Sequence, residues 1–467
     1  MVMRREKDSL GEMEVPASAY YGAQTARAVQ NFPISGLKPH PAFVRAVVII
    51  KKCAAAANMA TGRLSSEIGA AIVAAADEVL AGHLDDQFVV DPFQAGAGTS
   101  HNMNINEVLA NRALELLGRQ RGDFSTLHPN DHVNMAQSTN DVIPTAIRLA
   151  SLEMLDPLLG ALEALELALA AKSAEFDPIL KSGRTHLQDA VPIRLGQEFG
   201  AYASAVRKNR EGLESCIPAL LELGIGGTAV GTGLNAERGY MSSVIREVGL
   251  ATGFPVVAAP DLFEAMQNMD PFLALSSALR RMAVNLGRIA NDLRLMASGP
   301  RTGLDEIRLP AVQPGSSIMP GKINPSIAEM TNMVCYQIMG CDQAVMLAAQ
   351  AGQLELNVMM PLIAYNLTFS LELAKNCVQK FTDSCITGIE ANRERCQRYL
   401  EDSLGLVTVL APSIGYNAAA EVAKESVATG GSIREIVLAR GLMPESELEE
   451  AMRPGHLTEP GLPLGEK

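Results

Sequence analysis

An apolar stripe near residue 280 restricts the folds that this chain can adopt. Apolar residues recur there in steps of three and four without a break: Phe272, Leu275, Leu279, Met282, Leu286, Ile289, Leu293 and Met296. Such a 3.5-residue repeat predicts a helix roughly 37 Å long that packs against other helices at crossing angles of about 20°. A second stripe upstream has the same spacing: Leu155, Leu158, Leu162, Leu165 and Leu169. The sequence therefore predicts a bundle of long helices.

Three further stretches with helical spacing would bring this bundle to about five helices, namely 195–223, 327–349 and 356–381. Alternating β-branched residues are scarce, so we expect few strands, confined to the first ~60 residues and the loops. The predicted fold class is therefore mainly α. The Pro/Gly-rich tail from Pro454 predicts a loose end.

Changes in this pattern predict three domains. Residues 1–140 mix short helices with turns and predict an α-rich N-terminal domain. Residues 141–392 hold the long helices together with a long loop over 299–326. Residues 393–467 return to short amphipathic stretches and predict a small C-terminal helical domain.

The composition limits the partners that the chain can have. Charged residues make up 19%, below the roughly 25% of an average domain, which favours helices covered by other copies of the chain. The net charge of -13, the 4% of aromatic residues and the absence of Trp argue against nucleic-acid binding. No apolar run reaches the ~18 residues of a membrane span, and residues 1–8 lack the apolar core of a signal peptide. We therefore expect a cytoplasmic protein.

Cysteine and histidine spacing gives little support for a metal site. The 7 cysteines contain no CxxC pair, so buried free thiols are the expected state. His128 and His132 stand four apart, but Pro129 interrupts a helical register and no third ligand is in view. We expect neither a metal nor a cofactor.

Four polar segments differ from ordinary linkers. The loop over 299–326 contains GSSIMPGKINP at 315–325, and compact domains rarely contain so long a connection unless it acts as a lid or binding loop. The other three are GAGTSHNMN at 96–104, HPNDHVNMAQSTND at 128–141 and SGRTHLQD at 182–189. All are rich in neutral hydrogen-bond donors beside glycine or proline, as expected of segments that bind an anion.

Taken singly, each segment also has a structural explanation. The long loop could be a structured turn, and it lacks the spacing of a phosphate-binding Walker A motif. Ser138 or Asn140 could cap a helix over 141–152, although a capped helix N-terminus also binds carboxylates. His186 could be a structural residue as well as a catalyst.

In their order and spacing the four segments resemble the aspartase/fumarase superfamily, and the resemblance runs almost end to end. GSSIMPGKINP is similar to the signature loop of that superfamily. The resemblance implies a three-domain fold whose central five-helix bundle forms a twenty-helix core in a homotetramer. It also implies active sites shared among three subunits.

The resemblance implies elimination of a group HX across the Cα–Cβ bond of a small dicarboxylate, without a cofactor. Removal of the Cβ proton makes the neighbouring carboxylate doubly negative, an aci-carboxylate, and its stabilisation decides the rate. Ser316 matches the base, His186 and Glu329 match a pair near the leaving group, and Lys322 would stabilise the serine alkoxide. The matching substrate-binding residues are Thr99, Ser138, Thr139 and Ser317 for the β-carboxylate, Thr185, Lys322 and Asn324 for the α-carboxylate, and Asn140 with His186 for the leaving group.

Smaller features favour ammonia as the leaving group and L-aspartate as the substrate. QSTND at 137–141 and GQLELNVM at 352–359 resemble members that release ammonia. HPND at 128–131 instead resembles a second dicarboxylate site of class II fumarate hydratases, and Met360 stands where ammonia-releasing members usually have Glu. A hydratase acting on L-malate and a catalytically silent helical scaffold are therefore the alternatives.

Overall fold

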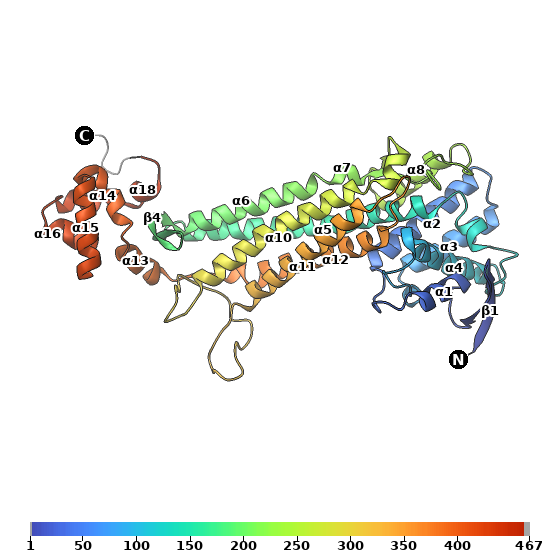
Figure 1. Ribbon diagram of the computed structural model, residues 1–467, viewed down its shortest axis with the longest axis horizontal. Coiled ribbons are helices and arrows are strands. Elements are labelled where there is room, and N and C mark those ends of the chain that lie inside the picture. The colour runs from blue at the N-terminus through green and yellow to red at the C-terminus, as the bar shows by residue number, and fades with distance from the viewer. Residues whose placement is uncertain (1, 462–467) are drawn as a thin grey trace. The chain divides into compact units, whose positions relative to one another are not determined.

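The computed structural model describes residues 2–461, and helices dominate them (Figure 1). This confirms the mainly α fold class. Five helices are long: α5 (Thr139–Phe176), α6 (Leu195–Glu214), α10 (Asp270–Met296), α11 (Ser326–Gln350) and α12 (Met360–Ser384). Every residue of the two predicted apolar stripes, which lie on α5 and α10, is at most 5% exposed. Both stripes therefore face the interior, as predicted.

Side-chain contacts join neighbouring long helices, as a bundle requires. The contacts are those of Phe176 with Phe199 between α5 and α6, of Tyr202 with Asp292 between α6 and α10, and of Asn332 with Gly287 between α11 and α10. Apolar stripes set the burial of these helices, while the polar pairs fix which residues meet.

Two predicted helix boundaries are wrong. The stretch 195–223 is not one helix, because α6 ends at Glu214 and is followed by α7 (Ile217–Leu220) and a short strand. Pro218 lies in the first turn of α7, where a proline is tolerated because that N–H needs no partner within the helix. The stretch 356–381 becomes helical only at Met360, after a tight turn between Gln353 and Leu356.

The described chain packs as two compact units, and each long helix contributes residues to both. Unit 1 comprises the chain up to Gly160, Glu211–Ala283 and Val334–Lys375. Unit 2 comprises Ala161–Arg210, Val284–Met333 and the chain from Asn376. The domain boundaries expected at residues 140 and 392 remain predictions.

Unit 1 adds short elements to its segments of the long helices. These are β1 (Met3–Asp8), β2 (Gly11–Pro16), α1 (Ala23–Asn31), α2 (Pro41–Ala60), α3 (Ser66–Leu80), α4 (Thr99–Leu116), the π-helical turn η3 (Pro129–Val133), α7, β5 (Glu222–Leu223), α8 (Tyr240–Thr252), β6 (Val257–Ala258) and α9 (Leu262–Gln267). Most residues of helix α2 are buried. It forms the centre against which α3, α4 and α8 pack.

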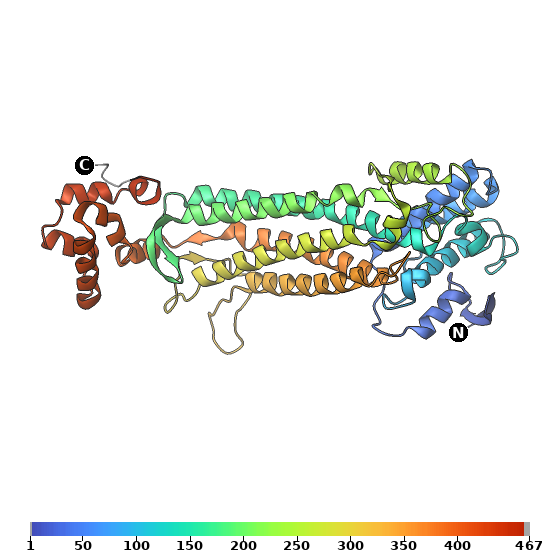
Figure 2. The same cartoon turned by 45° about the horizontal axis from the view of Figure 1, so that its top comes forward.

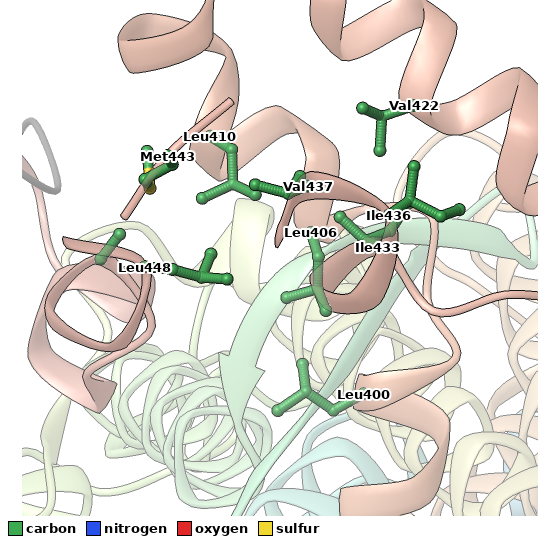
Figure 3. Close-up of a cluster of buried hydrophobic side chains, with 10 residues drawn as sticks. Leu400, Leu406, Leu410, Val422, Ile433, Ile436, Val437, Met443 and Leu448 are labelled. Carbon is green, nitrogen blue, oxygen red and sulfur yellow. The ribbon is translucent and has the colours of Figure 1, made fainter. Parts of the chain in front are cut away.

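Unit 2 adds a hairpin and a group of small helices to its segments of the long helices (Figure 2). The elements are β3 (Leu180–Thr185), β4 (Gln188–Arg194), β7 (Ile307–Arg308), β8 (Glu390–Ala391), α13 (Arg393–Glu401), α14 (Leu406–Ile414), α15 (Tyr416–Thr429), α16 (Ile433–Ala439), α17 (Glu445–Ala451) and α18 (Pro454–Thr458). The small helices share a buried apolar cluster that includes Leu406, Leu410 and Val437 (Figure 3). The hairpin packs against α13, α14 and α18.

The strands pair two by two in the described residues. β1–β2, β3–β4 and β7–β8 are antiparallel and β5–β6 is parallel. β1–β2 lies in the first 60 residues and the others lie in connections between helices, as predicted. The tail from Pro454 was expected to be loose, but it begins with α18, and residues 462–467 lie outside the described chain.

Two further expectations concern thiols and membranes. All 7 cysteines are free and buried, as predicted. Between residues 2 and 461, no helix combines the length and the apolar character that crossing a membrane would need.

Candidate active site

The predicted site residues fall into two groups, one in each unit. Unit 1 holds Thr99, Ser138, Thr139 and Asn140, whereas unit 2 holds Thr185, His186, Ser316, Ser317, Lys322, Asn324 and Glu329. Nearly all of them lie in loops or in the first turn of a helix. This placement is typical of residues that bind a ligand, because loops and helix ends present unpaired polar groups.

Thr99 is the first residue of α4 and is exposed. The chain reaches it through Ala97 and Gly98, which both have positive φ, at 62° and 91°. A Cβ atom on Gly98 would lie 3.0 Å from the Ile143 side chain, so glycine permits both the turn and the close packing. No side chain of Gly98 caps this N-terminus, although the N–H of His101 donates to Oε1 of Gln94 (3.1 Å). A helix N-terminus of this kind suits an anion.

Ser138 caps α5. Its Oγ accepts from the backbone N–H of Asn140 (3.2 Å), and its own N–H donates to Oδ1 of Asp141 (2.9 Å). Of the two candidate capping residues, Ser138 is therefore the cap and Asn140 lies in the first helical turn. The Asn140 side chain donates to the carbonyl oxygen of Ala229 (2.8 Å), which fixes the direction of its amide.

The hydroxyl groups of Ser138 and Thr139 are oriented by the N–H groups that they accept. Thr139 Oγ1 accepts from the Asn102 side-chain amide (3.1 Å), as Ser138 Oγ accepts from Asn140. An N–H group can only donate, so each hydroxyl proton must point elsewhere. Both half-buried hydroxyls therefore have a proton left to donate to an anion.

Two buried titratable side chains of opposite charge, Asp141 and Lys51, lie near these hydroxyls. Asp141 is fully buried, and its Oδ2 accepts from the N–H groups of Gly226 (3.1 Å) and Thr228 (2.9 Å). Burial raises the pKa of Asp141 to about 7, although the backbone N–H groups and Lys51 oppose that rise. Burial likewise lowers the pKa of Lys51 to about 7, with Asp141 acting in the opposite direction.

Thr185 and His186 lie at the tip of the β3–β4 hairpin. His186 and Leu187 have φ of 55° and 59°, the two consecutive positive values of a type I′ turn. Left-handed backbone is unfavourable for residues other than glycine, and here it turns the exposed His186 away from the strands. His186 is thus presented at a hairpin tip rather than packed in the core.

Buried charges support the base of this hairpin. Glu306 is fully buried, and its carboxylate contacts Arg184 (2.7 Å) and Lys181 (2.8 Å). Lys181 also contacts Glu198 (3.0 Å). Burial alone would lower the pKa of Lys181, but the two carboxylates raise it above its usual value. Arg184 directly precedes Thr185, so Glu306 ties the hairpin tip to the start of the long loop.

The long loop extends away from α10 and α11, as a lid or binding loop would (Figure 1). Its neck is closed by Gly315 N–H donating to the carbonyl oxygen of Lys322 (2.8 Å) and by the Asn324 amide donating to Gly315 (2.6 Å). A Cβ atom on Gly315 would lie 2.5 Å from the Lys322 carbonyl oxygen, so only glycine fits this neck. The loop has no helix between Met296 and Ser326, as predicted.

Inside the neck, Ser316 accepts two backbone hydrogen bonds. Its Oγ lies 3.2 Å from the N of Ile318 and 3.0 Å from the N of Met319. Donors to this oxygen favour its negative form, as a serine base requires. Ser317 follows on the exposed side of the same turn.

The remaining predicted residues of unit 2 lie near the base of the loop. Lys322 and Asn324 line a cavity of about 730 Å³ together with Asp305 and Arg308. Glu329 lies in the first turn of α11 and is half-buried, 4.0 Å from Arg294 of α10. A contact between Glu329 and His186 remains a prediction.

His128 and His132 serve the turn in which they lie. His128 Nδ1 accepts from the N–H of Asn130 (3.1 Å), and His132 Nδ1 accepts from the N–H of His128 (2.8 Å). No cluster of three potential metal ligands occurs within residues 2–461.

Sequence patterns alone do not predict the groups that hold the site residues in place. Asp141, Lys51, Asn102 and Glu306 are buried polar side chains that contact site residues or their neighbours. One of them had a detectable signal, since Lys51 follows Val44 and Val47 on the apolar stripe of a helix, where a charge is unusual.

Family models and curated proteins match most of this chain. A family model described as "Lyase" matches residues 11–340, and one described as "Fumarase C C-terminus" matches residues 406–459. Aspartate ammonia-lyase of Bacillus subtilis is 50% identical over 459 residues, which cover 98% of this chain and 97% of that protein. Aspartate ammonia-lyase of Escherichia coli is 47% identical, with 98% and 96% covered.

Solved structures agree with this assignment. A fumarate lyase:delta crystallin from Brucella melitensis, solved with cobalt bound, has a TM-score of 0.95 at 50% identity, covering 98% of this chain and all of that one. A class II fumarase from Schistosoma mansoni has a TM-score of 0.93 at 40% identity, covering 97% and 98%. With a family model over most of its length and full-length relatives at about 50% identity, this chain belongs to the aspartase/fumarase superfamily of lyases.

Proposed function

We propose that this chain is an aspartate ammonia-lyase, a carbon–nitrogen lyase that converts L-aspartate reversibly to fumarate and ammonia. The observation that supports this choice of substrate is the full-length identity of 47–50% to proteins named aspartate ammonia-lyase. The fumarase from Schistosoma mansoni is a more distant match at 40% identity. The polar geometry of the two groups of residues supports the reaction type.

The β-carboxylate of the substrate binds Thr99, Ser138, Thr139 and Ser317. The proton directions of Ser138 and Thr139 support this role, because both hydroxyls are already held as donors before the substrate arrives. Donors fixed in advance stabilise charge that develops in the transition state, at about 2.7 to 4 kcal/mol for each donor. The aci-carboxylate is the group on which that charge develops.

Ser316 removes the Cβ proton. The N–H groups of Ile318 and Met319 favour its alkoxide, and Lys322 brings a positive charge when the loop closes on the substrate. Lys322 also binds the α-carboxylate with Thr185 and Asn324. Closure of the loop excludes water from the base and assembles these groups around the substrate.

The Cα–N bond then breaks and its electron pair leaves with nitrogen, while the electrons of the aci-carboxylate form the carbon–carbon double bond. The amino group of L-aspartate already carries its third proton, so it leaves as ammonia without an acid. Asn140 and His186, with Glu329 behind His186, hold this group. The proton on Ser316 returns to solvent, and the products are fumarate and ammonium.

We infer a homotetramer with active sites shared among three subunits. Helix α11 supports this proposal, because large apolar side chains on it are exposed in the single chain: Met333 at 66%, Tyr336 at 61% and Leu347 at 55%. An exposed apolar face on a long helix predicts a partner surface. Light scattering on the purified protein should give four times the chain mass, and Tyr336→Glu should lower that mass. A monomeric and active wild-type protein would contradict the tetramer.

A two-substrate assay tests the function. Fumarate absorbs in the ultraviolet, so its formation is followed directly, once with L-aspartate and once with L-malate. Turnover of L-aspartate with little turnover of L-malate is the expected result. The reverse preference would assign the chain to the hydratases, and no turnover of either would favour a silent scaffold. The cytoplasmic location remains part of the proposal, to be checked by cell fractionation.

A further inference from the structure

Lys51 is a buried cation that the mechanism above does not use. It lies in the middle of α2 with no exposed surface, among buried neighbours such as Val47, Val48 and Ala54. The next residue, Lys52, is part-exposed and pairs with Asp77 at 2.5 Å. Of these two adjacent lysines, Lys51 is therefore buried and faces the turn that leads to Ser138, whereas Lys52 faces the surface.

The Lys51 ammonium holds two amides of the turn that leads to Ser138. It donates to Oδ1 of Asn134 (2.8 Å) and to Oε1 of Gln137 (2.9 Å). A cation can only donate, so it fixes which end of each amide faces it. The opposite ends donate to the backbone of the same turn, Asn134 to Gln137 O (3.2 Å) and Gln137 to Val133 O (3.0 Å).

One of these amides connects Lys51 to Thr139. Asn134 Oδ1 also accepts from Nδ2 of Asn102 (3.1 Å), and the same Nδ2 donates to Oγ1 of Thr139 (3.1 Å). Both protons of the Asn102 amide are therefore used. Because the ammonium can only donate, Asn134 must present its oxygen, and Asn102 must then donate both to Asn134 and to Thr139. The Thr139 hydroxyl proton therefore points away from Asn102.

A second set of contacts holds the other side of the same turn. Asp141 accepts from Ser138 N, Gly226 N and Thr228 N, and its charge opposes that of Lys51 across the buried region. The turn that bears Ser138 and Thr139 therefore lies between a buried cation and a buried carboxyl group.

We propose that Lys51 is a positioning residue for the β-carboxylate pocket: through Asn134 and Asn102 it sets the hydrogen-bond direction of Thr139, so that this hydroxyl donates to the substrate. The inference rests on the proposed function, because it assigns the pocket to the β-carboxylate. Its consequence is specific. Loss of Lys51 weakens binding of a doubly charged aci-carboxylate more than binding of an ordinary carboxylate, since the oriented donor matters most where charge accumulates.

The test compares two ligands of similar size. Succinate carries an ordinary carboxylate, whereas 3-nitropropionate, ionised to its nitronate, carries negative charge on two oxygens next to the former Cβ and resembles the aci-carboxylate. Dissociation constants for both are measured by calorimetry on the full-length protein, and kcat and KM are measured with L-aspartate. The variants are Lys51→Met and Asn102→Asp, with Lys52→Met as the matched control.

We expect Lys51→Met to weaken nitronate binding about 100-fold and succinate binding less than about fivefold, with kcat lowered more than KM is raised. Asn102→Asp retains the size of the side chain but accepts the Thr139 proton, so it should give the same pattern even if Lys51→Met does not fold. Lys52→Met should match the wild type in every measurement.

Equal weakening of both ligands would indicate a merely structural role and overturn the proposal, and so would wild-type affinities in both variants. Failure of both variants to fold, with Lys52→Met folded, would assign Lys51 to the fold and overturn it as well. A wild-type protein inactive with L-aspartate would instead refute the proposed function, so the two failures are distinguishable.

Discussion

In the proposed mechanism the N-terminus of α5 and the long loop both present serine hydroxyls to one substrate, but the protein supports the two hydroxyls in different ways. Ser138 and Thr139 are half-buried, and buried side chains from α2 and α4 hold the groups around them. Ser316 lies in a turn whose hydrogen bonds are made within the loop itself, and its neighbour Ile318 is 83% exposed. Buried side chains of other helices therefore hold the α5 N-terminus, which we call the braced region. The long loop holds Ser316 by its own hydrogen bonds, and we call it the self-contained region.

This difference follows the two tasks of the mechanism. Stabilising a developing charge requires donors that do not reorient during the reaction, and a buried polar network provides such donors. A serine base has to reach the substrate and then allow the product to leave, which suits a loop with few contacts to the core. Substitutions in the braced region and in the self-contained region should therefore have different effects on activity and stability.

Ser316→Ala tests the self-contained side and should have the largest effect. We expect kcat with L-aspartate to fall at least about 1,000-fold, because no neighbouring group can take the Cβ proton. The thermal midpoint should not change, since the neck contacts of Gly315 with Lys322 and Asn324 remain. Ser326→Ala, at the start of α11, is the control. A kcat within tenfold of the wild type would remove Ser316 as the base.

The fold was largely predictable because long stripes of apolar residues determine which helix faces are buried. The stripes on α5 and α10 are buried as expected. The pattern does not predict the break after Glu214, because apolar residues continue through it. Pro218 does not identify the break either, since α5 runs through Pro144 and Pro157. A periodic pattern reports burial, but it does not report where the backbone turns.

The site was predictable only where residues lie in recognisable segments. Ser138 and Ser316 stand in contiguous motifs, and their surroundings are local hydrogen bonds. Lys51 contacts Asn134, about 80 positions away in the sequence, and Glu306 contacts Arg184, about 120 positions away. Such partners are brought together only by the packing of helices, which spacing along one sequence does not reveal.

Lys322→Met should produce the second largest effect. It tests whether the loop supplies the cation for the substrate and for Ser316. We expect kcat/KM to fall roughly 100-fold, with KM raised as well as kcat lowered, since both the α-carboxylate and the Ser316 alkoxide lose their cation. Lys380→Met removes an equal charge from an exposed position of α12 and should behave as the wild type. An unchanged KM would mean that the α-carboxylate binds elsewhere.

Glu306→Gln tests whether buried charges matter in unit 2 as they do in unit 1. The amide cannot satisfy both Lys181 and Arg184, so we expect a thermal midpoint several degrees lower and KM raised roughly threefold to tenfold. The effect on KM arises because Thr185 and His186 follow Arg184 at the hairpin tip. Glu394→Gln, exposed on α13, is the control. A lower midpoint with unchanged KM would limit Glu306 to stability.

Asp141→Asn should give the smallest effect. It tests the braced region through the pH dependence of the free energy of unfolding. The folded pKa of about 7 lies above the ordinary value of 3.8, so between these values the folded state binds more protons than the unfolded state. The contribution of Asp141 to the free energy of unfolding therefore falls as pH rises from 4 to 7, whereas an asparagine contributes equally throughout. Lys51, with its pKa lowered to about 7, remains largely protonated below that pH and adds little to the slope.

We expect the thermal midpoint of Asp141→Asn, followed by circular dichroism, to rise relative to the wild type by a few degrees between pH 4.5 and pH 7. The comparison at each pH removes the titration of all other groups, because both proteins share them. A difference that stays constant would mean that Asp141 ionises as an exposed carboxyl group does. Hydrogen bonds alone would then hold the turn of Ser138 and Thr139. Buried charges would not distinguish the N-terminus of α5 from the long loop.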